Sequence, residues 1–125
     1  MKRLAIALVL GSAACSPVAG TASAVDVCWR VSDPEGGAAR NEAVAVDIPN
    51  LETCAARLEA VRMMEGRPVT GLYNGHFIFV TEASVLSAQT LDGTRFRVFE
   101  PEDRKEIQVG IQALMDHEAA GKAGR

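Results

Sequence analysis

VTGLYNGHFIFVT, residues 69–81, is the densest run of strand-forming residues in the chain, and Asn74-Gly75 lies at its centre. Asn-Gly between two apolar stretches favours a two-residue type I′ turn, because both residues adopt positive φ at little cost. Counting outward from this turn pairs Tyr73 with His76. The stretch therefore predicts a β-hairpin.

Side chains alternate between the two faces of a strand, so the hairpin divides into two sets. One face carries Tyr73, His76, Ile78 and Val80, and the other carries Leu72, Phe77 and Phe79. Both sets are largely apolar. We therefore expect the second strand to be central in a sheet that is covered on both sides.

Two further strands extend the hairpin into a four-strand meander. Glu82-Ala83 predicts one turn, and Asp92-Gly93 predicts another between strands 85–91 and 94–99. Counting from Asp92-Gly93 sets Gln89 opposite Phe96, and sets Leu86 opposite Phe99. Upstream, alternating valines predict strands over 25–31 and 43–48, separated by a surface loop over 33–41 that contains Pro34 and Gly36-Gly37.

Two amphipathic helices complete the predicted elements. After Asn50, a favourable N-cap, apolar residues recur at helical spacing over 51–65, with Gly66 as the stop signal and Glu59 outside the apolar stripe. The second helix begins at Pro101 and carries a stripe of Ile107, Ile111, Leu114 and Met115. We expect it to end near Glu118 and residues 119–125 to form a disordered tail.

The first 24 residues have the three parts of a secretory signal peptide. These are Lys2-Arg3, a short apolar run over 4–10 and the A-x-A site that ends at Ala24. Lipoprotein processing at Cys15 is the alternative, although Ser12 stands where such signals usually carry leucine. Either route predicts a periplasmic or secreted protein, anchored to the membrane only in the lipoprotein case. The composition, rich in alanine and in arginine over lysine, resembles that of small envelope proteins of GC-rich Gram-negative bacteria.

The mature chain is long enough for one domain with a modest core. Removing 24 of 125 residues leaves 101, and removing Lys2 and Arg3 leaves 11 basic side chains against 16 acidic ones, a net charge of −5. Nucleic acid binding requires clustered cationic charge, so we expect no nucleic-acid partner. The mature chain contains no apolar run of transmembrane length.

Cys28 and Cys54 are the two cysteines that follow the signal region. In an oxidising compartment they favour a disulfide, which would tie the first strand to the first turn of the first helix. The predicted fold is therefore α+β: a small single domain over 25–118, with an antiparallel β-meander sheet, two packed helices and one disulfide.

The sequence contains no recognisable catalytic or cofactor motif. It lacks a serine nucleophile elbow, a phosphate loop, a dinucleotide fingerprint and an H-E-x-x-H helix. The two histidines, His76 and His117, fall in different predicted elements, so we assign neither a metal nor a cofactor.

Two polar groups are candidate binding sites. The predicted pairing brings Tyr73, His76 and Gln89 together on one face at the end of the central hairpin, either as a recognition patch or as polar residues half in water. Arg95 and Arg97 lie two apart on the last strand and share a face, where they could clamp an anion or protect a sheet edge from unwanted pairing.

These observations favour a non-catalytic periplasmic binding or protein-interaction domain, with another envelope protein as its partner. A small hydrolase or isomerase that uses His76 is a second hypothesis, and it requires another ionisable group beside that histidine. An accessory lipoprotein subunit, lipidated at Cys15, is a third. The sequence pattern sets no oligomeric state.

Overall fold

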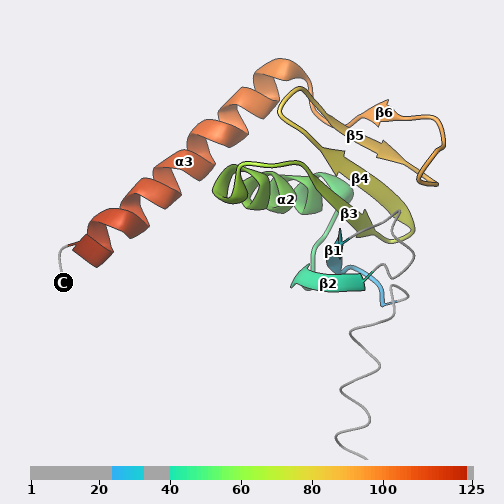
Figure 1. Ribbon diagram of the computed structural model, residues 1–125, viewed down its shortest axis with the longest axis horizontal. Coiled ribbons are helices and arrows are strands. Elements are labelled where there is room, and N and C mark those ends of the chain that lie inside the picture. The colour runs from blue at the N-terminus through green and yellow to red at the C-terminus, as the bar shows by residue number, and fades with distance from the viewer. Residues whose placement is uncertain (1–23, 33–39, 124–125) are drawn as a thin grey trace, which may run out of the picture.

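The computed structural model describes residues 24–32 and 40–123, in which antiparallel strands form one sheet in the order β2-β1-β3-β4-β5-β6 (Figure 1). The strands are β1 (Cys28–Ser32), β2 (Arg40–Ala45), β3 (Val69–Tyr73), β4 (His76–Val80), β5 (Val85–Ala88) and β6 (Phe96–Arg97). The described helices are α2 (Leu51–Glu65) and α3 (Pro101–Ala123). The predicted α+β fold is confirmed, and the first two strands extend the predicted meander.

The central hairpin has the predicted turn and register. Asn74 and Gly75 have φ angles of 44° and 85°, as a type I′ turn requires. Tyr73 pairs with His76, and the remaining pairs follow in order along β3 and β4. β4 lies between β3 and β5, so its predicted central position is also confirmed.

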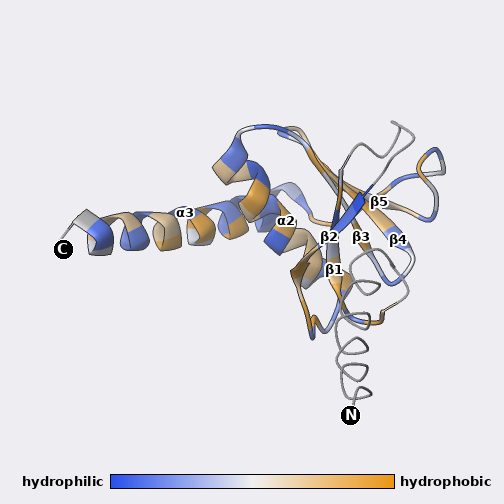
Figure 2. Ribbon diagram, turned by 60° about the horizontal axis from the view of Figure 1, so that its bottom comes forward, coloured by the Kyte–Doolittle hydropathy of each residue, from blue (hydrophilic) through white to orange (hydrophobic). Residues whose placement is uncertain are grey.

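The helix α2 packs on one face of this sheet and forms the core with it. From the strands, the buried cluster includes Cys28, Val69, Tyr73, Ile78, Val80 and Val85, and from α2 it includes Cys54, Ala55 and Leu58. Close packing depends on Gly71 in β3, because a Cβ atom there would overlap the side chain of Leu58. Both helices lie on the same side of the sheet (Figure 2).

The bounds of α2 agree with the sequence prediction at both ends. The side chain of Asn50 accepts a hydrogen bond of 2.8 Å from the backbone N–H of Thr53, and Gly66 ends the helix at φ 74°. Cys28 and Cys54 form the predicted disulfide, with their Cα atoms 5.3 Å apart. A bidentate ion pair from Arg30 to Glu65 ties β1 to the other end of α2.

The predicted bounds of five elements are wrong. β1 covers 28–32 rather than 25–31. β2 covers 40–45 rather than 43–48, because Asp47 has a φ of 57° that breaks an extended strand and because pairing with β1 recruits the polar residues 40–42. β5 and β6 are shorter than expected, and Phe96 pairs with Ser87 rather than Gln89. The helix α3 continues to Ala123, five residues beyond the expected end at Glu118.

Some of the predicted segments lie outside the described residues. These are the signal peptide except Ala24, Cys15 within it, and most of the predicted loop over 33–41.

Neither of the described helices has the length and apolar character needed to cross a membrane.

Candidate interaction surface

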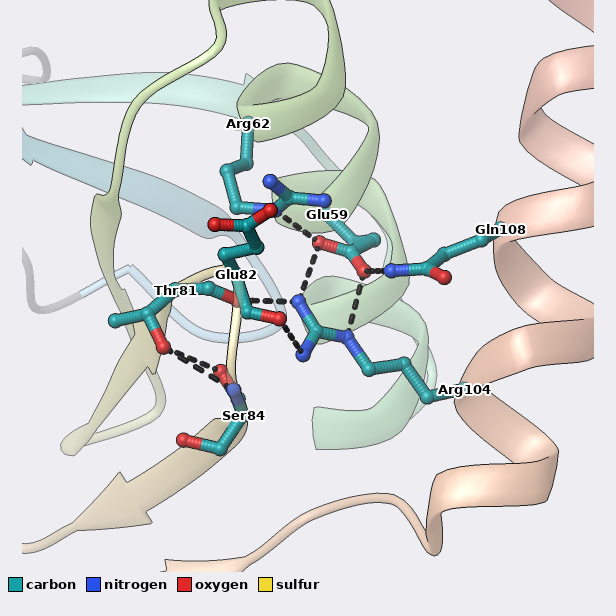
Figure 3. Close-up of polar contacts among 7 residues, drawn as sticks. All are labelled: Glu59, Arg62, Thr81, Glu82, Ser84, Arg104 and Gln108. Atoms are coloured by element: carbon teal, nitrogen blue, oxygen red, sulfur yellow. Dashed lines mark hydrogen bonds and ion pairs between the residues drawn. The ribbon is translucent and has the colours of Figure 1, made fainter.

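A buried polar cluster holds the beginning of α3 against α2 and the turn between β4 and β5 (Figure 3). We call this cluster the clasp: Glu59, Arg62, Arg104, Gln108 and the backbone carbonyls of Thr81 and Glu82. Arg104 Nε donates to Glu59 Oε2 at 2.7 Å, and its Nη2 donates to Oε1 at 3.1 Å. The same guanidinium donates to both carbonyls. Arg104 therefore joins three separate parts of the chain.

Glu59 is charged although it is completely buried. Burial acts to raise the pKa of its carboxyl, but hydrogen bonds from Arg104, Arg62 and Gln108 outweigh burial, so that the pKa lies below its usual value. Arg62 Nε and Gln108 Nε2 donate at 2.7 Å and 2.8 Å. Because its charge is paired and its hydrogen bonds are made, the clasp is built as a structural joint.

The clasp is notable because α3 contributes no residue to the hydrophobic core. Among the described residues, the half-buried apolar side chains that pack on the core come from β2, α2 and the segment 98–99: Val44, Ala45, Leu51, Val61, Val98 and Phe99. None belongs to α3. The helix is thus held at its first eight residues and then extends away from the sheet and α2 (Figures 1 and 2).

The apolar residues that the sequence predicted for one side of this helix lie mostly in its extended part, although Ile107 lies within the first eight residues. We call them the stripe: Ile107, Ile111, Leu114 and Met115. Leu114 is 69% exposed, and the other three are half-buried. An amphipathic helix normally buries such a stripe against its own domain. Here no member of the stripe belongs to the core, and Leu114 is largely open to solvent.

The sheet face opposite α2 is a second apolar surface, which we call the open face: Leu72, Phe77, Phe79, Leu86, Arg95 and Arg97. Its four apolar residues are half-buried, and neither described helix lies on this side. The sheet was expected to be covered on both sides, but neither described helix covers this one. Trp29 lies on the same side opposite Leu72, and its buried Nε1 has no hydrogen-bond acceptor among the described residues.

The two arginines share the open face, as the sequence predicted. The guanidinium of Arg95 lies 3.8 Å from the ring centroid of Phe79, an arrangement that combines cation–π attraction with partial cover of the ring. Arg97 pairs with Leu86 across the strands and lies 3.4 Å from a carboxylate oxygen of Glu100. The two cations thus lie at the β6 edge of an apolar surface.

The candidate patch at the hairpin end is divided between the core and the surface. The Tyr73 hydroxyl is turned into the core, where it donates to the Ile48 carbonyl at 2.5 Å, and burial followed by the nearby Asp26 carboxylate raises its pKa. His76 is exposed at the start of β4, and Gln89 is exposed just after β5. Because Phe77 pairs with Ala88, the next position in the same register sets Gln89 level with His76. Tyr73 therefore acts as a structural donor, while the other two face solvent.

No group of three His, Cys, Asp or Glu residues in the described part of the chain is arranged to hold a metal ion.

The sequence did not predict the clasp, because helical spacing placed Glu59 on the solvent side of its helix. A signal for it was present: Arg104 stands three residues before Ile107 and seven before Ile111, so it interrupts the apolar side of α3.

Comparison with known proteins adds no relationship, since no family model, curated protein or solved structure matches this chain.

Proposed function

We propose that this chain is an exported, non-catalytic protein-interaction domain of the bacterial envelope and that α3 is its contact element. Export is supported by Lys2-Arg3, the apolar run over 4–10 and the A-x-A site before Val25. A disulfide between Cys28 and Cys54 suits an oxidising compartment. The partner is a protein molecule of that compartment.

One observation carries the proposal: a polar clasp, rather than apolar packing, holds α3, so that the stripe is left for another molecule. Leu114 is 69% exposed although it is aligned with Ile107 and Ile111. Exposed apolar surface of this kind is typical of docking sites. A helix that lays apolar residues at i, i+4 and i+7 into a partner is a common mode of recognition.

The buried polar residues of the described chain support a non-catalytic role. Glu59 and Arg104 satisfy each other within the clasp, and the Tyr73 hydroxyl is used by the Ile48 carbonyl. These are the groups that an active site would keep free for a substrate. Their hydrogen-bonding capacity is instead spent on joining elements of the fold.

The proposal is tested by photo-crosslinking in intact cells. A photoreactive amino acid is placed at Leu114 in one strain and at Val109 in another. Val109 is a matched control because it is 67% exposed and, at about 100° per residue, points to the side of α3 opposite the stripe. We expect a discrete protein adduct from position 114 and none from 109. Equal labelling at both positions, or no adduct at either, would refute the proposal.

A further inference from the structure

We infer that the stripe docks on the open face of a second copy of this chain, so that two molecules exchange their α3 helices. The inference rests on the proposed function, because it names the partner of the same contact element. Each molecule has one apolar helix side that contributes nothing to the core and one apolar sheet face without a described helix. An apolar helix side and an apolar sheet face can bury each other, as they do within a domain.

The two surfaces cannot meet within one molecule. α3 begins four residues after β6, and the clasp fixes it on the α2 side of the sheet. From there the helix extends away from the sheet instead of folding around its edge (Figures 1 and 2). The α3 that covers the open face must therefore come from another molecule.

The charges at the borders of the two surfaces are opposite. Asp103 and Glu118 lie four residues before Ile107 and four residues after Leu114, so an exposed carboxylate stands at each end of the stripe. The open face carries two exposed arginines at its edge, and no strand from β3 to β6 contains Asp or Glu, although Glu100 lies 3.4 Å from Arg97 just after β6. A docked stripe can thus place a carboxylate beside Arg95 or Arg97.

Two-fold exchange also gives a closed assembly. If the helix of one copy covers the sheet of the other, symmetry repeats the contact and leaves no free stripe to add a third molecule. Repetition doubles the buried area, which matters because stable interfaces bury roughly 1,200–2,000 Å² in total. A dimer is therefore the predicted end point.

Sedimentation of the disulfide-bonded mature chain over a range of concentrations provides the first test. We expect a reversible dimer. Leu114→Glu and Arg95→Glu each change an exposed side chain, one on the helix and one on the sheet, and should weaken dimerisation by a factor of about 30 or more if these are central contacts. Val109→Glu should leave it unchanged. Matching melting temperatures, measured at a dilution at which the wild type is also a monomer, would show that the monomer fold is intact in all three variants.

A mixed-copy NMR experiment identifies the surface. One copy carries a spin label on His117→Cys, an exposed position beside the stripe, attached after oxidation of the native disulfide, and the other carries ¹⁵N. We expect broadening of β4 and β5 amides in the ¹⁵N copy, whereas broadening confined to its α3 would indicate helix–helix pairing and overturn the inference. A monomer at all concentrations that still crosslinks from position 114 in cells would also overturn it, yet leave the proposed function standing. A monomer that also gives no adduct from position 114 would refute both the dimer and the proposed function.

Discussion

Replacing Arg104 by methionine should cost a large part of the stability of this domain. The substitution keeps an unbranched side chain but removes two hydrogen bonds to Glu59 and two to backbone carbonyls. Removing one partner of a buried ion pair costs roughly 3–5 kcal/mol, because it leaves an uncompensated buried charge. Since Arg62 and Gln108 still donate to Glu59, we expect the lower end, about 3 kcal/mol, of a total near 5–15 kcal/mol.

Urea unfolding, followed by circular dichroism, measures the free energy of unfolding. Lys105→Met is the matched control: it removes a neighbouring cation from the exposed side of the same helix and should change stability by less than about 0.5 kcal/mol. In a Glu59→Leu background, Arg104→Met should cost at least about 1 kcal/mol less than in the wild type, because the two residues are coupled. An Arg104→Met variant as stable as the Lys105→Met control would refute the reasoning.

The same cluster predicts a pH dependence. The folded-state pKa of Glu59 is lowered, so its stabilising contribution is present above the unfolded-state pKa of about 4.3 and is lost as pH falls through the lower folded-state value. Glu59→Gln should therefore be less stable than the wild type at neutral pH, and the difference should shrink below about pH 4. Unfolding curves collected at several pH values check this, and a constant difference would contradict it.

Three other predictions concern the core. Cys28→Ala with Cys54→Ala should lower the free energy of unfolding by about 3–4 kcal/mol, because it frees a long loop in the unfolded chain; a loss under about 1 kcal/mol in urea unfolding would contradict this. Gly71→Ala should lower the free energy of unfolding by roughly 1–3 kcal/mol, because the added methyl group overpacks the contact with Leu58. An unchanged melting temperature would show instead that α2 can shift to accommodate the methyl group. Tyr73→Phe should cost about 1–2 kcal/mol because the buried Ile48 carbonyl loses its donor, and a neutral result in the same assay would mean that water replaces the hydroxyl.

The sequence predicted those elements whose signals are local. Asn74-Gly75 set the central hairpin in register, because both residues take the positive φ that their turn needs. Asp92-Gly93 suggested a second turn of the same type and failed, since neither residue has positive φ. A longer loop, with a hydrogen bond from the Gly93 N–H to the Thr90 carbonyl, joins β5 to β6 instead. The pairing of β6 consequently shifts by two residues.

The clasp could not be derived because it depends on distant parts of the chain. Glu59 and Arg104 are 45 residues apart, and helical periodicity placed Glu59 among solvent-facing residues. Only the packing of α3 across α2 decides that this carboxylate is buried. Arg95 and Arg97 were correctly placed on one face, but the contact of Arg95 with Phe79 required the real course of the loop before β6. The sequence thus located the charges, and the fold gave them their partners.

We propose that α3 is anchored at its beginning and keeps its stripe for a partner. Hydrogen exchange on dilute protein tests this most directly, because the 15 residues after Gln108 are near the limit of about 12–15 residues below which an isolated helix is marginal in water. We expect the α3 amides beyond Gln108 to exchange much faster than those of α2. Protection equal to that of α2 along the whole of α3, at every dilution, would contradict it.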